Sequence, residues 1–275
     1  MAETSSVAII AGSGSFPLHV AAEAKRQGLT VVGIGLTGWV DPSLAGHVDA
    51  YEEVSVGQLG RLVERLKAHQ ATRAIMAGKV TKEVLFDSRV KFDADALGIL
   101  SRVKDFSVNG LLGAIGDLLS KQGIQLIDSS TFLKPNLCPA GPLTKRSPSP
   151  VEQEDIRVGA QAALQLAKLD VGQTVVVKNR VVVAVEALEG TDATIARAGQ
   201  LAGKPLVLVK VAAPSQDMRF DLPILGLGTI ASALAAGVTC IAVEAHKTIV
   251  LDKDAVVAKA DQAHICIIGI SATLT

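Results

Sequence analysis

The sequence predicts an α/β protein in which an N-terminal Rossmann-like domain with a parallel sheet precedes a C-terminal mixed α/β domain. Of the 275 residues, 49% are hydrophobic but only 3% are aromatic. Such a core is built from Ala, Val, Leu and Ile, which suits buried parallel strands covered by helices. Short apolar runs also alternate with helical stretches, as they do in βαβ units. A chain of this length has room for two domains.

A proline-rich stretch indicates where the two domains divide. Residues 131–150 contain five of the ten prolines in the chain, which is the strongest linker signal in the sequence. We therefore predict a Rossmann-like domain over residues 1–132, a linker over residues 133–150 and a catalytic α/β domain over residues 151–275.

The first half begins with an apolar run, Val7–Ala11, that ends in Gly-Ser-Gly. A helix is expected from Pro17 to Gln27, because Gly28 stands where a helix stop belongs. The other elements expected in this half are strands at Thr30–Leu36, Ala74–Ala77 and Ile124–Ile127, and helices at Val56–His69, Ala94–Val103 and Ser107–Lys121.

The second half contains a predicted hairpin, Thr174–Val177 and Val181–Val185, with Lys178-Asn179-Arg180 at its turn. The uncharged stretch 222–243 is long enough to span a bilayer, but Pro223 and three glycines favour a loop, a buried helix and a buried strand. The other expected elements are helices at Val151–Leu169, Asp192–Leu201, Thr229–Ala236 and Lys253–Asp261, strands at Leu206–Lys210, Thr239–Val243 and Ile265–Ile268, and an edge strand at Thr248–Leu251.

Charge and cysteine content disfavour several classes of function. Lys plus Arg and Asp plus Glu both number 27, so no net field attracts nucleic acid. The three cysteines contain no C-x-x-C pair, which argues against a disulfide framework or a zinc ribbon. Cys240 and Cys266 lie in apolar runs and are expected in the core. Since no basic segment precedes an apolar one at the N-terminus, we expect a cytoplasmic protein without a signal peptide.

The loop between the first predicted strand and the first helix suits a phosphate group. Gly12, Ser13 and Gly14 let the backbone approach a ligand, and the N-terminus of a helix favours an anion. Pro17 occupies the position of the third glycine of the dinucleotide fingerprint, and no acidic residue ends the second strand, so NAD binding is disfavoured. Phosphate or uridine binding and a plain tight turn both remain open.

Charged residues at predicted strand ends offer further ligands. Lys79, after the third strand, could meet a pyrophosphate at the same sheet edge or simply be solvated. Glu186, Glu189 and Asp192 follow a strand within seven residues, and Mg²⁺ and Mn²⁺ prefer such oxygen ligands. Alternatively, Thr191 or Asp192 caps the next helix.

Gln216–Pro223 is the segment richest in candidate groups. Arg219 can pair bidentately with phosphate, and Asp221 could bind a metal or activate water. The alternative for Asp221 is an ordinary turn residue before Leu-Pro. Glu244, at the end of another predicted strand, could line a site.

Taken together and in this order, these motifs resemble those of UDP-2,3-diacylglucosamine pyrophosphatases of the LpxI type. The resemblance implies hydrolysis of UDP-2,3-diacylglucosamine to UMP and 2,3-diacylglucosamine 1-phosphate (lipid X) in lipid A biosynthesis, with Mg²⁺ or Mn²⁺ as cofactor. The family's Arg-x-Asp-Leu-Pro motif places the catalytic aspartate at Asp221, with metal-assisted attack by water as the mechanism class. The matching segments are Gly12–Pro17, Gly78–Val80, Glu189–Ala193, Gln216–Pro223, and Gly226 with Thr229-Ile230.

Other residues of these motifs are expected to take part. Arg219 would assist Asp221 in catalysis, and the expected metal ligands are Asp221, Asp192 and Glu189. His246 is a departure, because the family usually has glycine there, and a glycine can mark a backbone conformation that disfavours Cβ. The residues expected to contact substrate are Gly12, Ser13, Gly14, Phe16, Lys79, Thr191, Gln216 and Thr229.

The implied substrate is a UDP-sugar lipid, so we expect transient peripheral contact with the inner-membrane surface and no nucleic-acid partner. A homodimer is an open alternative for the assembly. Two other functions also compete with the hydrolase. A Rossmann-type NAD enzyme would change the nicotinamide absorbance, and a non-catalytic nucleotide-sugar or lipid-binding protein would bind the UDP-sugar without releasing UMP.

Overall fold

The chain folds into two compact units, which we describe from a computed structural model of all 275 residues. Unit 1 comprises Met1–Leu133 and Asp217–Asp221, and unit 2 comprises Lys134–Gln216 and Leu222–Thr275. A short segment from the second half of the sequence is therefore part of unit 1. The structure describes residues 6–80, 90–103, 108–213, 217–220 and 222–271.

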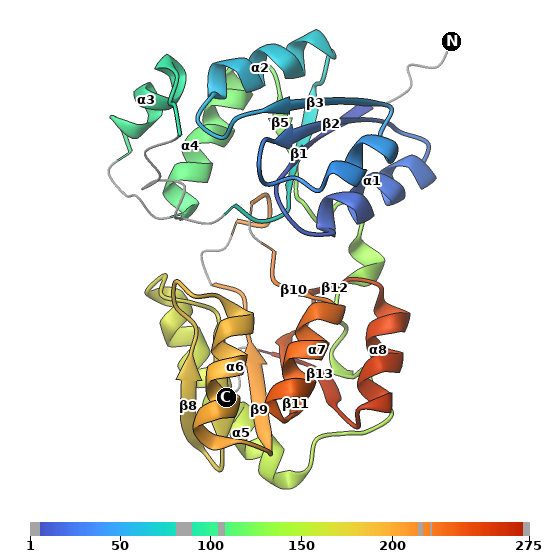
Figure 1. Cartoon of the computed structure of the whole chain (residues 1–275), viewed down its shortest axis with the longest axis vertical. Coiled ribbons are helices and arrows are strands. Elements are labelled where there is room, and N and C mark those ends of the chain that lie inside the picture. Colours follow the sequence, from blue (N-terminus) through green and yellow to red (C-terminus); the bar gives the residue numbers. More distant parts are fainter. Residues whose placement is uncertain (1–5, 81–89, 104–107, 214–216, 221, 272–275) are drawn as a thin grey trace. The chain divides into compact units, whose positions relative to one another are not determined.

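Unit 1 is built on a five-stranded parallel sheet with the order β3-β2-β1-β4-β5 (Figure 1). This is the order of a Rossmann-type sheet, and it confirms the fold class predicted for the first half. The elements are β1 (Ser6–Ala11), β2 (Thr30–Leu36), β3 (Ala50–Val54), β4 (Arg73–Ala77), β5 (Gln125–Leu126), α1 (Phe16–Arg26), α2 (Leu59–Ala68), α3 (Ala94–Leu100) and α4 (Val108–Lys121).

Side chains alternate between the two faces along each strand. Both faces of this sheet are buried, because helices cover each of them. Ala8 and Ile10 of β1 belong to a core cluster with Leu66 of α2 and Leu119 of α4. Ile9 is fully buried on the opposite face, where α1 packs against β1 and β2. The aliphatic composition therefore serves a sheet that is covered by helices on both sides.

Two strands of unit 1 differ from the prediction. The sequence pattern does not reveal β3, because Tyr51, Glu52 and Glu53 form no apolar run and only Val54 of the strand is buried. This strand lies at the edge of the sheet, where polar side chains remain in contact with water. The strand expected at Ile124–Ile127 is shorter than predicted, since β5 has two residues.

Unit 2 contains a mixed six-stranded sheet with the order β6-β13-β11-β9-β7-β8. Strands β9, β11 and β13 are parallel to one another. Helix α5 covers one face, and α6, α7 and α8 cover the other (Figure 1), which confirms the predicted mixed α/β fold. The elements are β6 (Gly141–Pro142), β7 (Thr174–Lys178), β8 (Val181–Val185), β9 (Leu206–Lys210), β11 (Val238–Glu244), β13 (Cys266–Ile270), α5 (Pro150–Lys168), α6 (Thr191–Ala202), α7 (Leu227–Ala236) and α8 (Lys253–Gln262).

The predicted hairpin is confirmed as β7–β8, with a tighter turn than expected. Lys178 belongs to β7, so the loop consists of Asn179 and Arg180 alone. Both residues have positive φ, 50° and 66°, which is the signature of a type I′ turn. Asp155 of α5 accepts hydrogen bonds from both of their amides, and this contact holds the turn against the helix.

The proline-rich segment, predicted as a linker, is packed into unit 2. It contains a short 3₁₀ helix, Lys134–Asn136, and its Gly141 and Pro142 pair with β13 as strand β6. The edge strand expected at Thr248–Leu251 is present but shorter, because β12 (Ile249–Val250) pairs with β10 (Ile224–Leu225) in a separate two-stranded sheet. Partners that are distant in the sequence decide both outcomes.

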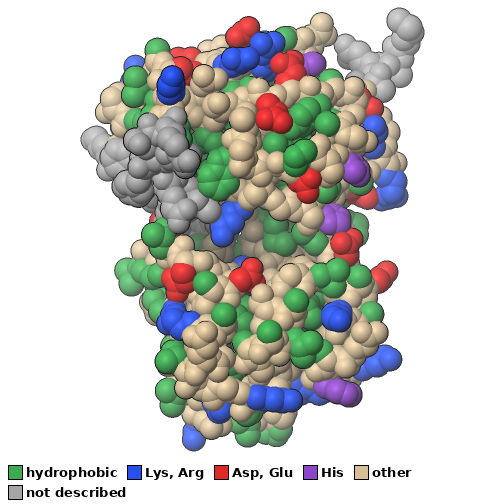
Figure 2. Space-filling model, viewed as in Figure 1, with side chains coloured by type: hydrophobic (Ala, Val, Ile, Leu, Met, Phe, Trp, Pro, Cys, Tyr) green, Lys and Arg blue, Asp and Glu red, His purple; other side chains and the backbone are tan. Residues whose placement is uncertain are grey.

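The helix and the buried strand expected in the uncharged stretch 222–243 are present as α7 and β11. The expected loop contains the short strand β10, and α7 is not buried as expected, because only Ile230 and Ala233 of the helix are buried. No helix within the described residues is long and apolar enough to cross a membrane. Cys240 and Cys266 are fully buried free thiols, which confirms their expected place in the core. On the face drawn in Figure 2, cationic and anionic side chains are interspersed, in keeping with equal numbers of the two charges.

Candidate functional site

Two loops are joined at the carboxyl edge of the unit 1 sheet. Ser13, after β1, and Lys79, after β4, exchange two backbone hydrogen bonds of 2.9 Å each. The Ser13 hydroxyl also donates to the Lys79 carbonyl at 2.8 Å, and the Gly12 amide donates to Ala77 at 2.8 Å. The predicted neighbourhood of the first loop and Lys79 is therefore present in the structure.

Close packing of the two loops explains why glycine occupies two of these positions. A Cβ at Gly12 would lie 2.8 Å from the Lys79 carbonyl oxygen. Gly78 has a φ of +90°, and its Cβ would lie 2.7 Å from the carbonyl carbon of Gly12. Both residues thus allow backbone to meet backbone. Gly14, by contrast, has a φ of +91° and open space around it.

The start of α1 has unused hydrogen-bond donors. Among the described residues, no acceptor binds the amides of Gly14, Ser15 or Phe16, and the first turn of a helix carries a partial positive charge. Lys79 is exposed, and its ammonium has no partner within the described part of the chain. The Phe16 side chain is buried in the core, so only its amide faces this edge. These groups favour an anion such as phosphate.

Ser129 fastens the Arg219 segment to the same edge. Ser129 follows β5 and is almost completely buried. Its amide donates to the carbonyl of Met218 at 3.0 Å. Its hydroxyl lies 2.7 Å from the carbonyl oxygen of Met76 in β4 and 2.8 Å from that of Arg219. Arg219 is therefore held beside the end of the strand that leads to Lys79.

The Arg219 guanidinium is paired with Asp217 two residues before it. The two side chains form hydrogen bonds of 2.6–3.0 Å, which raise the pKa of Arg219 and lower that of Asp217. The guanidinium also lies 4.8 Å from the ring centre of Phe220. Within the described residues its Nη1 donates to nothing, so one edge of the guanidinium is available to a phosphoryl oxygen.

The predicted metal ligands are only partly described. Asp221 lies outside the described residues, as does Gln216. Asp192 is exposed in the first turn of α6. The Glu189 carboxylate already binds Arg197 at 2.6 Å, the Thr194 hydroxyl at 3.3 Å and the amide of Ala187 at 3.1 Å. Its own backbone amide and Arg197 lower the pKa of Glu189. No group of three His, Cys, Asp or Glu residues suited to a metal occurs within the described ranges.

Thr191 belongs to a polar chain at the carboxyl edge of the unit 2 sheet. Its hydroxyl donates to Glu186 at 2.8 Å and accepts from the ammonium of Lys210, at the end of β9, at 3.1 Å. The cap of α6 is Gly190, with a φ of +80°. The expectation that Thr191 or Asp192 caps this helix is therefore wrong, because the Thr191 hydroxyl is bound to Glu186 instead.

Glu244 anchors the loop that follows β9. Its carboxylate is buried, accepts the amide of Ala212 at 2.8 Å and pairs with Lys247 at 2.7 Å. His246 has a φ of +62°, so the expectation that the backbone there adopts a conformation disfavouring Cβ is confirmed. Thr229 lies in the first turn of α7 and is partly buried.

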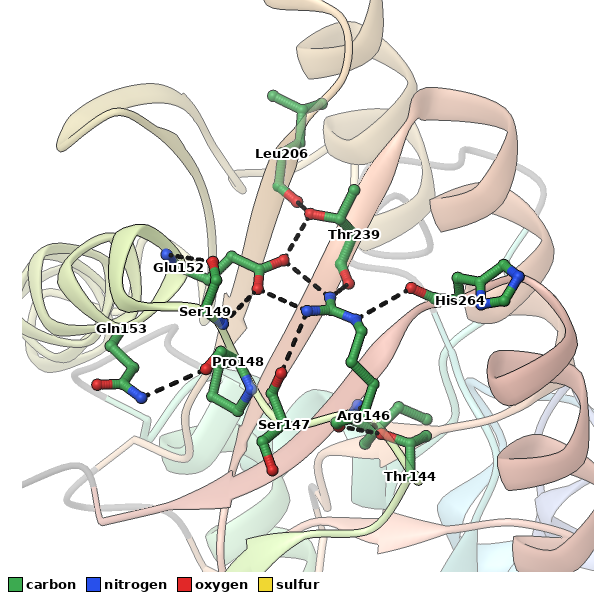
Figure 3. Close-up of polar contacts among 11 residues, drawn as sticks. Thr144, Arg146, Ser147, Pro148, Ser149, Glu152, Gln153, Leu206, Thr239 and His264 are labelled. Atoms are coloured by element: carbon green, nitrogen blue, oxygen red, sulfur yellow. Dashed lines mark hydrogen bonds and ion pairs between the residues drawn. The ribbon is translucent and has the colours of Figure 1, made fainter.

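A second polar cluster lies at the amino edge of the unit 2 sheet, where Arg146 uses all five of its N–H donors (Figure 3). The guanidinium makes a bidentate pair with Glu152 at 2.7 and 2.8 Å and donates to the carbonyls of Ser147, Thr239 and His264. Glu152 also completes a capping box with Ser149 at the start of α5. The cluster ties α5 to the beginnings of β11 and β13, so its role is structural.

Sequence reasoning did not select Arg146, Ser129 or Lys210, although each carried some signal. The spacing Ser-x-x-Glu at Ser149–Glu152 is that of a capping box. Ser129 stands in a polar run after a short strand, and Lys210 ends an otherwise apolar one. A charged residue at the carboxyl end of a buried strand is a candidate ligand-binding group.

Comparison with known proteins supports the family that the motifs and their order resemble. A family model described as the LpxI N-terminal domain matches residues 6–135, and one described as the LpxI C-terminal domain matches residues 139–268. The UDP-2,3-diacylglucosamine pyrophosphatase LpxI of Caulobacter vibrioides (strain ATCC 19089 / CIP 103742 / CB 15) is 32% identical over 273 residues, which cover 95% of this chain and 96% of the relative.

Among solved structures, the crystal structure of AnUbiX (PadA1) in complex with FMN and dimethylallyl pyrophosphate covers 44% of this chain and 92% of its own. Its identity is 10% and its TM-score is 0.19, so it supports no argument about this protein. The two family models, by contrast, match both halves in order and cover nearly the whole chain. The chain belongs to the LpxI family.

Proposed function

We propose that this protein hydrolyses the pyrophosphate bond of UDP-2,3-diacylglucosamine to UMP and 2,3-diacylglucosamine 1-phosphate, in lipid A biosynthesis. The observation that carries the proposal is the likeness to the Caulobacter vibrioides pyrophosphatase, which extends over 95% of this chain and 96% of that one at 32% identity. If the two proteins shared only one domain, the alignment would cover only part of the relative. Here both halves match, including the segment Gln216–Pro223 that joins the two units.

The geometry of unit 1 supports this chemistry. Hydrolysis of a pyrophosphate develops negative charge on phosphoryl oxygens, and preorganised donors stabilise that charge. The Lys79 ammonium, the Nη1 side of Arg219 and the amides of Gly14–Phe16, which no described acceptor binds, are such donors, and they stand at one sheet edge. We propose that they hold the phosphates, and that Asp221, two residues after Arg219, is the catalytic aspartate.

We also propose a requirement for Mg²⁺ or Mn²⁺. A divalent cation would neutralise phosphoryl charge and activate water. Asp221 and Asp192 are the proposed ligands among the residues selected from the sequence. Glu189 fits that role poorly, because Arg197, Thr194 and the amide of Ala187 already occupy its carboxylate. A metal would first have to displace the Arg197 guanidinium.

A diacylated substrate resides in a membrane, so we propose transient contact of the protein with the inner-membrane surface. Several leucines of unit 2 are exposed: Leu169 at 74%, Leu188 at 70%, Leu201 at 65%, Leu234 at 48% and Leu227 at 44%. Such side chains gain about 1.5–3 kcal/mol each on full burial. They are therefore suited to contact acyl chains, and the protein is then peripheral rather than integral.

The test is release of UMP from UDP-2,3-diacylglucosamine by the wild type and by Asp221→Ala, each with Mg²⁺, with Mn²⁺ and after EDTA. We expect metal-dependent release that falls at least 100-fold in the mutant. The matched control is Asp254→Ala, which removes an exposed carboxylate from the first turn of α8 and should retain full activity. Circular dichroism of each variant shows whether it is folded.

Absence of UMP release from the folded wild type under every metal condition would reject the hydrolase. Tight binding of the same UDP-sugar without release would then identify the protein as a non-catalytic carrier. Undiminished activity after EDTA would reject the metal requirement but leave the hydrolytic function in place.

A further inference from the structure

The Lys210 ammonium is a partly buried cation without a counterion among the described residues. It lies at the carboxyl end of β9 and donates one hydrogen bond, to the Thr191 hydroxyl at 3.1 Å. No carboxylate oxygen of the described residues comes within 4.0 Å of its Nζ. Two of its three N–H donors therefore have no protein acceptor in the described part of the chain. A positive charge withdrawn from water without a partner is unfavourable.

Three other partly buried cations of this protein are compensated, whereas the partly buried Lys253, at the start of α8, has no hydrogen-bond or ion-pair partner among the described residues. Arg146 has the Glu152 carboxylate, and Arg219 has Asp217. Lys178 has no carboxylate, but three carbonyl oxygens accept its three N–H groups. Lys210 has a single neutral oxygen. Lys210, unlike Lys253, is also oriented by a hydrogen bond and stands at the carboxyl end of a strand, so its remaining donors are placed to serve a ligand.

The hydrogen bonds around Lys210 have a fixed direction. An ionised Glu186 only accepts, so the Thr191 hydroxyl, 2.8 Å away, must give its one proton to that carboxylate. The lone pairs of the same oxygen then face Lys210 and the Thr174 hydroxyl, which lies 3.4 Å away. Thr191 has no proton left for a substrate. The Thr191 hydroxyl therefore orients the Lys210 ammonium, and its hydrogen bond to Glu186 fixes the direction in which its lone pairs point.

The nearest charged residue on the adjacent strand does not neutralise Lys210. Lys210 is in register with Val243 of β11, and Glu244 follows directly. The Glu244 carboxylate, however, is occupied by Lys247 and by the amide of Ala212. The carboxyl ends of parallel strands are where α/β sheets bind ligands, and Lys210 stands at such an end.

We propose that Lys210 is an anion-binding residue that takes a phosphoryl oxygen, and that Thr191 and Glu186 are positioning residues for its ammonium. The identity of the substrate that brings the phosphoryl group rests on the proposed function. The anion site itself follows from the uncompensated ammonium alone. Because a phosphoryl group occurs in both halves of a nucleotide sugar, the two halves are tested separately.

Isothermal titration with inorganic pyrophosphate, UMP and glucosamine 1-phosphate tests the site directly. We expect Lys210→Met to weaken pyrophosphate binding about tenfold or more, while Lys168→Met, an equal charge change at an exposed position of α5, leaves it unchanged. Loss for UMP alone assigns Lys210 to the nucleotide half, and loss for glucosamine 1-phosphate alone assigns it to the sugar half. Equal affinity of Lys210→Met and Lys168→Met for all three probes would overturn the proposal.

The positioning residues have a separate readout. Thr191→Val removes the hydroxyl but keeps the shape, whereas Thr191→Ser keeps the hydroxyl. We expect the valine variant to raise KM for UDP-2,3-diacylglucosamine about tenfold with little change in kcat, and the serine variant to restore it. Glu186→Gln should raise KM in the same way. Equal behaviour of the valine and serine variants would reject the positioning role, and this comparison holds even where Lys210→Met does not fold.

Failure of the anion site and failure of the proposed function are distinguishable. Wild type that binds pyrophosphate through Lys210 but releases no UMP keeps the site and rejects the pyrophosphatase. Wild type that releases UMP, with Lys210→Met as active and as tightly binding as Lys168→Met, keeps the pyrophosphatase and rejects the site.

Discussion

At the scale of single residues, His246 has an unfavourable backbone conformation. Its φ is +62°, and the left-handed region costs an L-residue with a Cβ about 1 kcal/mol or more. The conformation follows from the sharp turn after β11, where the His246 amide donates to the carbonyl of Cys138 at 2.8 Å. Glycine would adopt the same turn without a steric penalty.

We therefore predict that His246→Gly raises the free energy of unfolding by about 0.5–1 kcal/mol. The gain is smaller than the full steric penalty because glycine also makes the unfolded chain more flexible. Urea denaturation of the purified variant measures the change. His246→Ala is the control, since it removes the imidazole but keeps Cβ. A gain as large for alanine as for glycine would show that the side chain, and not φ, is responsible.

Glu152 is a second residue with a defined energetic role. Burial raises the pKa of its carboxyl, but hydrogen bonds from Arg146, the Ser149 amide and the Thr239 hydroxyl outweigh burial and lower the pKa from 4.5 to about 2. A carboxyl whose pKa is lower in the folded state binds its proton more readily when unfolded. It therefore stabilises the fold above pH 4.5, and this contribution is lost as pH falls from 4.5 towards 2.

Glu152→Gln should lower the free energy of unfolding by about 2–3 kcal/mol at pH 7. The difference from the wild type should shrink as the pH falls towards 2, because the wild-type carboxyl is then protonated. Denaturation at several pH values follows both effects. The matched control is Glu154→Gln on the same helix, which breaks an exposed pair with Arg157 and should change stability by less than about 0.5 kcal/mol. A pH-independent difference would contradict the ionic origin.

At the scale of elements, one lysine links the β7–β8 hairpin to the end of α6. The Lys178 ammonium donates to the carbonyls of Ala202, Gly203 and Lys204 at 2.7, 3.1 and 3.1 Å. These carbonyls lie at the C-terminus of the helix. The last carbonyls of a helix have no intrahelical N–H donors and carry a partial negative charge. The ammonium therefore caps the helix and fixes the hairpin beside it.

Lys178→Met should destabilise the protein by about 1–2 kcal/mol, because three carbonyls, two of them partly buried, lose their donor. Hydrogen exchange should increase in the last turn of α6 and in β7 more than elsewhere in unit 2. Lys168→Met removes an exposed lysine from the last turn of α5 and serves as the control. If the two variants are equally stable, the three carbonyl contacts contribute nothing measurable.

At the scale of the whole molecule, the chain passes between the two units three times, because Asp217–Asp221 belongs to unit 1 while its flanking residues belong to unit 2. Phe220 packs into the core cluster of unit 1. Its ring atom Cζ lies 3.5 Å from the point where a Cβ on Gly116 of α4 would stand. Together with Ser129, this contact fixes Arg219 in unit 1. A motif from the second half of the sequence thus completes the first unit.

Phe220→Ala should therefore destabilise unit 1 more than unit 2. We expect a loss of about 1–3 kcal/mol, below the range for a fully buried phenylalanine because Phe220 is only partly buried. Hydrogen exchange of α4 and β5, compared with that of α5 and β11, locates the effect. Leu188→Ala, which truncates an exposed side chain of unit 2, is the control. Faster exchange confined to unit 2 would contradict the assignment of this segment.

Local pattern was sufficient for much of the fold. Thr30–Leu36, Val181–Val185 and Leu206–Lys210 have the predicted bounds, because apolar runs between turn signals depend on neighbouring residues alone. The motif order was also enough to identify the family. The carboxylates were harder to predict: Glu189 and Glu186 are close in sequence, yet one binds Arg197 and the other orients Thr191. Sequence spacing does not reveal which partner a flexible side chain selects.

The sequence by itself determined the α/β class, the parallel sheet of the first half, the hairpin of the second and membership of the LpxI family, since composition, periodicity and motif order are properties of the linear chain. Only the tertiary structure decided that β12 pairs with β10, that Gly141 and Pro142 join the main sheet, that Arg219 is fastened to unit 1 by Ser129, and that no described carboxylate pairs with Lys210. Each of these depends on contacts between residues far apart in the sequence, and such contacts are fixed by the packing of the whole unit rather than by local propensity.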